Sequence, residues 1–389
     1  SAAARSSPDR STLRAMAPPP ESSLAELLAR YDAGRPLAEA HTLPSAFYTD
    51  PRVFELERAT TFSRNWQWVA RAEQLAAPGR YVTAEVAGEP VVVVRGDDGV
   101  LRAFFNVCRH HAAAVMTDHA GSAPHLRCPY HGWTYALDGA LRGTPDFVGV
   151  CNFAREENSL VPVDVDTWEG FVFVRLERGG PGVRETLGSA LVDEVAALGL
   201  AALSFMEGRL YVLDCNWKVF VDNYLDGGYH VPHLHHGLDS VLDYKSYRIE
   251  LGPRHCLQWS PLVAPASADP DVAAVRRGER ALYYWLHPNL MINCYRGQMD
   301  VNIVRPVAVD RTEVLFHFYF EDVVGEEAVA RNRASIEVAD RIQIEDLDIC
   351  ASVQRGLRSR AYDTGRLSVR REAGEHLFHR LLAAELGAS

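Results

Sequence analysis

The chain has 389 residues, 47% of them hydrophobic and 23% charged, which is enough for two globular domains with separate cores. A formal net charge of −11 argues against nucleic acid as a partner and is compatible with a cationic substrate or a basic redox partner. No apolar run approaches the roughly 20 residues that cross a bilayer, so no membrane partner is expected.

The first twenty residues, SAAARSSPDRSTLRAMAPPP, are rich in Ala, Ser, Arg and Pro. This composition predicts a flexible tail or the remnant of a transit peptide, although a non-native extension or a start at Met16 fits equally well. Residues 21–60 follow as predicted N-terminal helices, over Glu21–Tyr31 and Pro51–Phe62, that pack on the C-terminal domain.

From Gly79 onward the hydrophobic period is that of strands. Residues 61–178 are therefore predicted to form an all-β domain, and the run Gly179–Gly182 is predicted to be a linker. The strands are expected at Tyr81–Val86, Pro90–Arg95, Leu101–Asn106, Trp133–Tyr135 and Gly170–Leu176.

Residues 183–389 are predicted to form a mixed α/β domain, in which helices flank an antiparallel sheet, so the chain as a whole is α+β. Strands are expected at Arg209–Asp214, Ala281–Leu286, Asp300–Arg305 and Thr312–Phe320, and helices at Trp217–Tyr224, Glu326–Gln354 and Glu372–Leu386. The longest helix should turn five apolar residues toward the core, namely Ile336, Val338, Ile342, Ile349 and Val353.

Two Cys-His pairs lie within the β domain. Cys108 and His110 form a C-x-H motif, and after seventeen more residues Cys128 and His131 form a C-x-x-H motif. Two thiolates and two imidazoles on two loops are the ligands of a Rieske [2Fe–2S] cluster. A Cys2His2 zinc site uses the same residue types, but zinc fingers group their ligands as a Cys pair and a His pair. The spacing therefore favours the cluster.

The other five cysteines are scattered and mostly embedded in apolar sequence. They are predicted to be buried free thiols of a protein in a reducing compartment, not a disulfide framework. These residues are Cys151, Cys215, Cys256, Cys294 and Cys350.

A second group of histidines follows the predicted linker. A mononuclear iron that activates O2 uses two imidazoles and one carboxylate and keeps positions open, and His230 and His235 supply the imidazoles in an H-x4-H motif. Residues five apart do not share a face of a regular helix, so Pro232 predicts a distorted turn between them. His233 and His236 compete for the second position; spacing does not decide, and we favour His235.

The carboxylate ligand has to come from elsewhere in the chain. The best candidates are the adjacent Glu345 and Asp346 in the long predicted helix. An adjacent acidic pair on a helix is more often only a solvated face, so the residues alone leave this ligand open.

The motifs CRHH, CPYHGW, DNYLDGGYHVPHLH and IEDLDICASVQRGL together resemble, in order and across nearly the whole chain, the Rieske-type non-haem iron oxygenases. The strings LPSAFYTDPRVFELE, NWKVFVDNYLDGGYHVP and PNLMIN look most like plant choline monooxygenases and related quaternary-ammonium oxygenases. The resemblance implies a [2Fe–2S] cluster on Cys108, His110, Cys128 and His131, and a mononuclear Fe(II) on His230, His235 and Asp346.

One position departs from the family pattern. Most members carry an Asp or Glu three residues before the first iron histidine, which links the iron to the cluster of a neighbouring subunit, but here that position is Gly227. Asp226 and Asp222 are the nearest carboxylates, and Asp226 is favoured by proximity.

The resemblance also implies an activity and partners. A ferredoxin or flavin reductase would supply electrons to a homotrimer in the cytoplasm or chloroplast stroma, and O2 would hydroxylate a cationic substrate, most simply choline to betaine aldehyde hydrate. The alternatives are N-demethylation of a betaine or carnitine-type compound, an aromatic ring-hydroxylating dioxygenase α subunit, and a Rieske electron carrier without catalytic activity.

A quaternary ammonium group cannot donate a hydrogen bond, so its site is expected to be an aromatic cage that works by cation–π attraction. The aromatic-rich stretch Leu282–Tyr295 is the candidate, with Tyr283, Trp285 and Tyr295 as the named residues. Aromatic residues in strands more often belong simply to the core.

Overall fold

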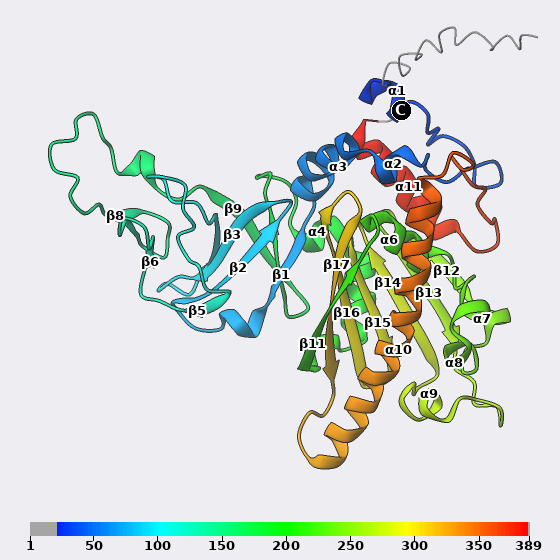
Figure 1. Ribbon diagram of the computed structural model, residues 1–389. Helices are drawn as coiled ribbons and strands as arrows, with labels where there is room; N and C mark the ends of the chain where they lie inside the picture. The colour runs from blue at the N-terminus through cyan, green and yellow to red at the C-terminus, as the bar shows by residue number, and fades with distance from the viewer. Residues whose placement is uncertain (1–21, 388–389) are drawn as a thin grey trace, which may run out of the picture.

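The computed structural model describes residues 22–387, so the predicted tail over residues 1–20 lies outside the described part. Figure 1 shows a unit of strands on the left joined to a larger sheet with helices on the right. This is the α+β arrangement predicted from the sequence. Among the described residues, no helix is both long and apolar enough to span a membrane.

The N-terminal unit is built on antiparallel strands. Its larger sheet has the order β1-β10-β9-β4-β3-β2-β5, and β6, β7 and β8 form a smaller sheet. The strand bounds are β1 Gln67–Arg71, β2 Arg80–Val86, β3 Glu89–Arg95, β4 Leu101–Phe105, β5 Ala120–Ser122, β6 Leu126–Arg127, β7 Thr134–Tyr135, β8 Leu141–Gly143, β9 Pro162–Trp168 and β10 Phe171–Arg175. The sequence prediction lacked β1, β5, β6, β8 and β9, although the alternation of Val163 and Val165 was a usable signal for β9.

The C-terminal unit is built on a seven-stranded antiparallel sheet of order β11-β17-β16-β15-β14-β13-β12. The strand bounds are β11 Ser204–Leu213, β12 Arg248–Leu251, β13 His255–Pro261, β14 Arg280–Leu286, β15 Leu290–Tyr295, β16 Gln298–Ala308 and β17 Arg311–Phe320. β12, β13 and β15 were not predicted as strands. Five of the six residues of β15 are buried, so β15 lacks the apolar–polar alternation of a half-exposed strand.

Helices cover this sheet and connect its strands. In Figure 1 the long α10 crosses the face of the sheet, and α11 lies near its upper end. The helix bounds are α4 Val183–Leu187, α5 Ser189–Ala197, α6 Trp217–Leu225, α7 Val231–Leu234, α8 His236–Asp239, α9 Pro270–Val275, α10 Glu326–Leu357 and α11 Ala373–Leu386.

The buried face of α10 differs in part from the prediction. Ile336 and Val338 are buried, but Ile349 and Val353 are 40% and 44% exposed. The buried stripe instead includes polar residues, among them Asn332, Ser335, Gln343, Asp346 and Gln354. The prediction assumed that apolar residues mark the inward face, and here that face carries the polar groups of a cavity.

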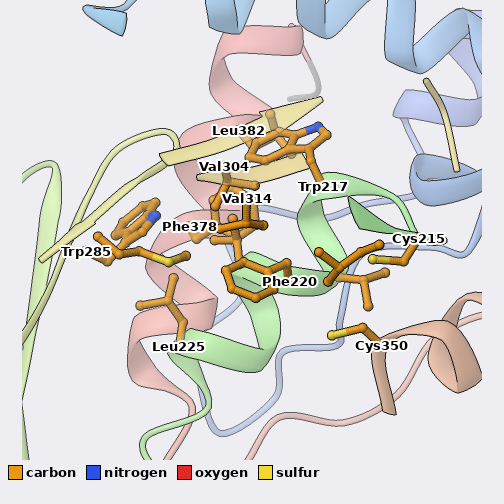
Figure 2. Close-up of a cluster of buried hydrophobic side chains, with 14 of the residues drawn as sticks. Cys215, Trp217, Phe220, Leu225, Trp285, Val304, Val314, Cys350, Phe378 and Leu382 are labelled. Atoms are coloured by element: carbon orange, nitrogen blue, oxygen red, sulfur yellow. The ribbon is translucent and has the colours of Figure 1, made fainter. Parts of the chain in front are cut away.

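The N-terminal segment packs against the C-terminal unit. It contains α1 Leu24–Leu28, shorter than the predicted helix, then α2 Ala46–Thr49 and α3 Pro51–Glu57, which continues as a π-helical turn over Arg58–Phe62. Leu28, Phe47 and Val53 share one hydrophobic core with Trp217 and Phe378. Figure 2 shows the centre of that core, where side chains of α6, α11 and the sheet meet.

A buried ion pair joins α3 to the first turn of α6. Lys218 Nζ lies 2.6 Å from Glu57 Oε1, Trp217 Nε1 donates to Glu57 Oε2 at 2.8 Å, and both charged side chains are 0% exposed. Burial raises the pKa of Glu57 and lowers that of Lys218, while their mutual attraction opposes both shifts. Losing one partner would leave the other charge buried without compensation.

We therefore expect Lys218→Met to lower the free energy of unfolding by about 3–5 kcal/mol, measured by urea denaturation. Arg64→Met, which removes the exposed pair between Arg64 and Glu177, is the control and should cost less than about 1 kcal/mol. Equal losses for the two variants would contradict a structural role for the buried pair.

Candidate metal centres and substrate cavity

The two Cys-His pairs meet at one end of the N-terminal unit. Cys108 and Cys128 each begin a tight turn, in which the cysteine carbonyl accepts a hydrogen bond from the amide four residues on. Cys108 and Cys128 belong to one cluster of buried side chains, and the rings of His110 and His131 have centroids 4.7 Å apart. The four residues predicted to bind a cluster therefore converge from two loops.

The surroundings of this site suit a metal cluster. Cys108 and Cys128 are 3% and 2% exposed, whereas His131 is exposed, so the histidine side faces solvent. His110 stacks on Trp133, with ring centroids 4.8 Å apart, and its Nδ1 is a buried atom with no hydrogen-bond partner among the described residues. An imidazole that is oriented and has a free nitrogen fits a metal ligand.

A tyrosine contacts one sulfur of this site. Tyr135 Oη lies 3.4 Å from Cys108 Sγ and accepts a hydrogen bond from the Arg109 amide, so its own hydrogen is available to the sulfur. Hydrogen bonds to cluster sulfurs are one of the factors that set a reduction potential. Sequence spacing gave no sign of Tyr135.

A second cluster of possible ligands lies in the C-terminal unit. His230, His235 and Asp346 each offer one donor atom, and these atoms lie within 4.8 Å of one another. His230 immediately precedes α7, His235 follows it, and Asp346 lies on α10. Two imidazoles and one carboxylate form the ligand set expected for an O2-activating iron.

The short α7 explains the H-x4-H spacing. Pro232 is in its first turn, and the helix ends at Leu234, so His235 has left the helical conformation, with φ −104° and ψ 65°. The rings of His230 and His235 can therefore face one another, with centroids 4.8 Å apart. His233 and His236 are exposed, whereas His235 is 2% exposed.

Carboxylates hold both histidines. His230 Nδ1 lies 2.6 Å from Asp226 Oδ2, and His235 Nδ1 lies 2.6 Å from Glu345 Oε2. His235 Nε2 lies 3.1 Å from Asp346 Oδ1. A carboxylate on the far nitrogen orients a metal-binding imidazole and raises its basicity. Glu345 and Asp346 thus contact different ring nitrogens of His235, a distinction that the residues alone left open and for which only the resemblance favoured Asp346 as the ligand.

The charge balance at His235 favours a cation. Burial lowers the pKa of His235, but hydrogen bonds and charges of Asp346 and Glu345 more than offset this effect, and the pKa is raised above its ordinary value. The same carboxylates that stabilise a proton on His235 would also stabilise a metal cation bound in its place.

The glycines before His230 explain the missing family carboxylate. Gly227 and Gly228 both have φ +68°, a backbone conformation that L side chains rarely adopt. A Cβ at Gly227 would lie 2.1 Å from the Arg371 carbonyl oxygen. No side chain fits there, and the turn brings the carboxylate of Asp226 back to His230 instead.

Asp222, the other candidate carboxylate, lies elsewhere. Its two oxygens contact Tyr48 Oη at 2.6 Å and His379 Nε2 at 2.9 Å. This group faces α2 and α11, and within residues 22–387 it forms no hydrogen bond with His230 or His235. The geometry therefore distinguishes Asp226 from Asp222, as proximity in sequence suggested.

A cavity of about 120 Å³ opens beside the three possible iron ligands. Of the predicted cage residues, Tyr283 and Tyr295 line it, together with Tyr224 and Tyr247. Trp285 does not: it is 0% exposed, packs on Phe378 and donates to the Pro288 carbonyl. Figure 2 shows Trp285 inside the hydrophobic core, so its predicted substrate contact is wrong. Trp285 and Tyr283 lie on the same face of the sheet, but α11 covers the part of that face where Trp285 lies.

Two charged groups also line the cavity. Asp300 on β16 is 6% exposed and accepts hydrogen bonds from Asn293 Nδ2 at 2.7 Å and Asn302 Nδ2 at 2.9 Å. Burial raises the pKa of Asp300, against the effects of Arg276 and the two amides. Arg276, just after α9, is 8% exposed. Both charges are far in sequence from the iron motifs, so spacing could not reveal them.

Comparison with protein families matches residues 65–154 to the Rieske [2Fe-2S] domain and residues 200–388 to the ring hydroxylating alpha subunit (catalytic domain). The chain is 36% identical over 375 residues to the chloroplastic choline monooxygenase of Arabidopsis thaliana, covering 93% of this chain and 86% of that protein. The chain belongs to the Rieske non-haem iron oxygenases.

Other Rieske oxygenases agree with this assignment. The carnitine monooxygenase oxygenase subunit of Escherichia coli (strain K12) is 34% identical over 365 residues, 89% of this chain and 94% of that subunit. The structure of the quaternary ammonium Rieske monooxygenase CntA with L-carnitine matches with a TM-score of 0.77 and 30% identity, over 94% of this chain and 99% of that one. A naphthalene 1,2-dioxygenase, 20% identical with a TM-score of 0.73, shares the fold.

As a Rieske oxygenase, the chain uses a [2Fe–2S] cluster and a mononuclear iron. The residues present fit both groups, through the free His110 Nδ1 in one unit and the carboxylate-held histidines in the other. The cysteines are all free thiols. Cys151 is exposed, however, and not buried as predicted, because it lies in an irregular surface loop.

Removal of one histidine tests the proposed iron ligands. We expect His235→Ala to lose the mononuclear iron while keeping the visible absorption of the cluster, because the donor atom and its two carboxylate contacts vanish together. Metal analysis with absorption spectroscopy makes this measurement. His233→Ala and His236→Ala are the matched controls and should retain iron; iron loss in either one would show that the ligand is misassigned.

Proposed function

We propose that this oxygenase hydroxylates a small quaternary ammonium compound at a C–H bond close to its nitrogen. The observation that carries the proposal is the cavity beside His230, His235 and Asp346, which is also lined by four tyrosines and by the buried carboxylate of Asp300. The similarity to choline and carnitine monooxygenases supports the same substrate class.

The tyrosines suit a cation that cannot form hydrogen bonds. Tyr283 Oη and Tyr295 Oη lie 2.8 Å apart, and Tyr224 Oη donates to Asn293 Oδ1 at 2.8 Å. Because these hydroxyls are engaged within the protein, the rings themselves are what remains for a ligand. Aromatic rings attract a quaternary ammonium group by cation–π interaction, worth about 2 kcal/mol or more when desolvated.

Asp300 supplies a negative charge to the same cavity. The Asn293 and Asn302 amides donate to its carboxylate and stabilise the ionised form against burial. A bound cation would act in the same direction. A neutral aromatic hydrocarbon would leave the buried charge of Asp300 without compensation. This carboxylate therefore favours an ammonium compound over an arene as the substrate.

We assign the cluster to Cys108, His110, Cys128 and His131, and the iron to His230, His235 and Asp346. When bound, these groups supply electron storage and O2 activation. The balanced reaction consumes the C–H compound, O2, two electrons and two protons, and gives the hydroxylated compound and water. At the carbinol carbon of choline the product is the aldehyde hydrate, whereas hydroxylation of an N-methyl group leads to loss of formaldehyde.

The protein side chains hold the reaction centre in place. Asp226 and Glu345 accept from the Nδ1 atoms of the two histidines, and Asn223 Nδ2 donates to Asp346 Oδ1 at 2.9 Å. Phe220, Val231 and Leu238 line the cavity and limit the access of water.

The electron path is proposed to cross between subunits. In Figure 1 the β6–β8 region, which contains the loop of Cys128 and His131, and the α7 region, which carries the iron histidines, lie on opposite sides of the molecule. A neighbouring copy in a homotrimer would bring the two centres together, with Asp226 between them, and a ferredoxin or flavin reductase would supply the electrons. The free thiols fit a reducing compartment, such as the cytoplasm or the chloroplast stroma.

Turnover tests the proposed function. The holoenzyme with a generic ferredoxin and reductase is given choline, carnitine, glycine betaine and a small aromatic acid, and product and O2 uptake are followed. We expect coupled oxidation of at least one ammonium compound and none of the aromatic acid. Coupled turnover of the aromatic acid alone would overturn the proposed substrate class while leaving both metal centres intact.

The Asp226→Asn variant tests the proposed position of Asp226 on the electron path between subunits. We expect a fall in turnover of roughly 10–100-fold, because the carboxylate no longer orients His230, while both metals stay bound. Single-turnover kinetics of cluster oxidation make the measurement. Asp222→Asn is the control, because Asp222 contacts Tyr48 and His379 instead; an equal slowing of cluster oxidation in this variant would contradict the assignment of Asp226.

A further inference from the structure

Arg276 is a buried cation whose hydrogen-bonding capacity is mostly unused. Its Nη1 donates to Ser335 Oγ at 3.0 Å, and the guanidinium lies 4.6 Å from the Tyr295 ring centroid. Its Nε is buried without a hydrogen-bond partner among residues 22–387. A guanidinium has five N–H donors, and leaving them unmet in a site of low polarity is costly.

The surroundings do not neutralise this charge by direct contact. Ser335 Oγ itself donates to Gln298 Oε1 at 2.8 Å, so Ser335 and Gln298 provide only neutral partners. Asp300 is close enough to influence Arg276 electrostatically, but within the described chain no ion pair of 4.0 Å or less involves Arg276. Asp300 instead accepts from two asparagines.

The position of Arg276 in the cavity is informative. The guanidinium is anchored at Ser335, whereas the possible iron ligand Asp346 lies eleven residues further along the same helix, roughly 16 Å along its axis. Ala339, Ile342 and Gln343 line the cavity between these points. A substrate would thus have one end near the iron ligands and the other toward the guanidinium.

We propose that Arg276 binds the carboxylate of a zwitterionic substrate, a quaternary ammonium compound with several carbon atoms between its two charges. This rests on the proposed function and specifies its substrate class. A guanidinium pairs with a carboxylate through two parallel hydrogen bonds, and it repels the ammonium group. The substrate is therefore oriented with its cationic end away from the guanidinium and toward the iron ligands.

A matched pair of ligands tests this on the unmodified protein. Carnitine and its methyl ester share the ammonium group and the carbon chain, but only the acid carries the carboxylate. Isothermal titration of the iron-loaded holoenzyme without O2 should show at least roughly tenfold tighter binding of the acid, as expected for a charge-assisted hydrogen bond. Choline should bind no more tightly than the ester.

Two substitutions locate the effect. Arg276→Gln should weaken binding of the acid by roughly 10- to 100-fold. Binding of the ester should stay the same or become tighter, because the repulsion between the guanidinium and the ammonium group is removed. Arg277→Gln removes the adjacent exposed arginine, which does not line this cavity, and should change neither ligand.

The outcomes separate the two proposals. Equal binding of acid, ester and choline to the unmodified protein, or equal loss of acid and ester in Arg276→Gln, would overturn the role of Arg276 while leaving ammonium oxidation intact. If no ammonium compound binds or is oxidised, the proposed function fails and this inference fails with it. Should Arg276→Gln not fold, the acid–ester comparison on the unmodified protein decides.

Discussion

The candidate iron site depends on the contact between His235 and two neighbouring carboxylates of α10. Glu345 contacts one ring nitrogen and Asp346 the other, at 2.6 and 3.1 Å. Adjacent residues on a helix point about 100° apart, so both can reach His235 only because this histidine sits just beyond the end of α7, close against α10. The rest of the C-terminal unit supports that approach: the antiparallel sheet carries α10 across its face, and the first turn of α6 is fixed to the same helix through the Asn216 amide and Gln354.

The other iron histidine depends on a different chain of contacts. The buried pair of Glu57 and Lys218 fixes the start of α6, and the helix leads to Asp226 and the double glycine. The turn after the helix is the point at which this chain departs from the family pattern. A side chain cannot be placed at Gly227, because the Arg371 carbonyl is too close, and the carboxylate one residue earlier takes the contact with His230. The contact with the histidine is thus made by a carboxylate at a different spacing.

The cavity beside these ligands combines opposite charges with aromatic rings. Asp300 and Arg276 are both buried, yet each is hydrogen-bonded to neutral side chains. Charges held apart in this way are available to a ligand that brings complementary charges of its own. The same fold occurs in relatives named as choline monooxygenase, carnitine monooxygenase and naphthalene 1,2-dioxygenase, so the fold alone does not specify the substrate.

The sequence by itself predicted the two-unit organisation and the four cluster residues, because metal ligands are few in type and their spacing is informative. The resemblance of the ordered motifs to one family added the predicted iron ligands. The sequence also placed the long helices and just over half of the strands. Tertiary structure decided the rest. The exposure of Ile349 and Val353, and the core position of Trp285, follow from which surfaces pack together, which periodicity does not show. His235 was separated from His233 and His236 by burial against α10, and Asp226 from Asp222 by the turn at two glycines. Asp300, Arg276 and the contact of Glu345 with His235 could be found only in three dimensions, since each depends on residues distant in the chain.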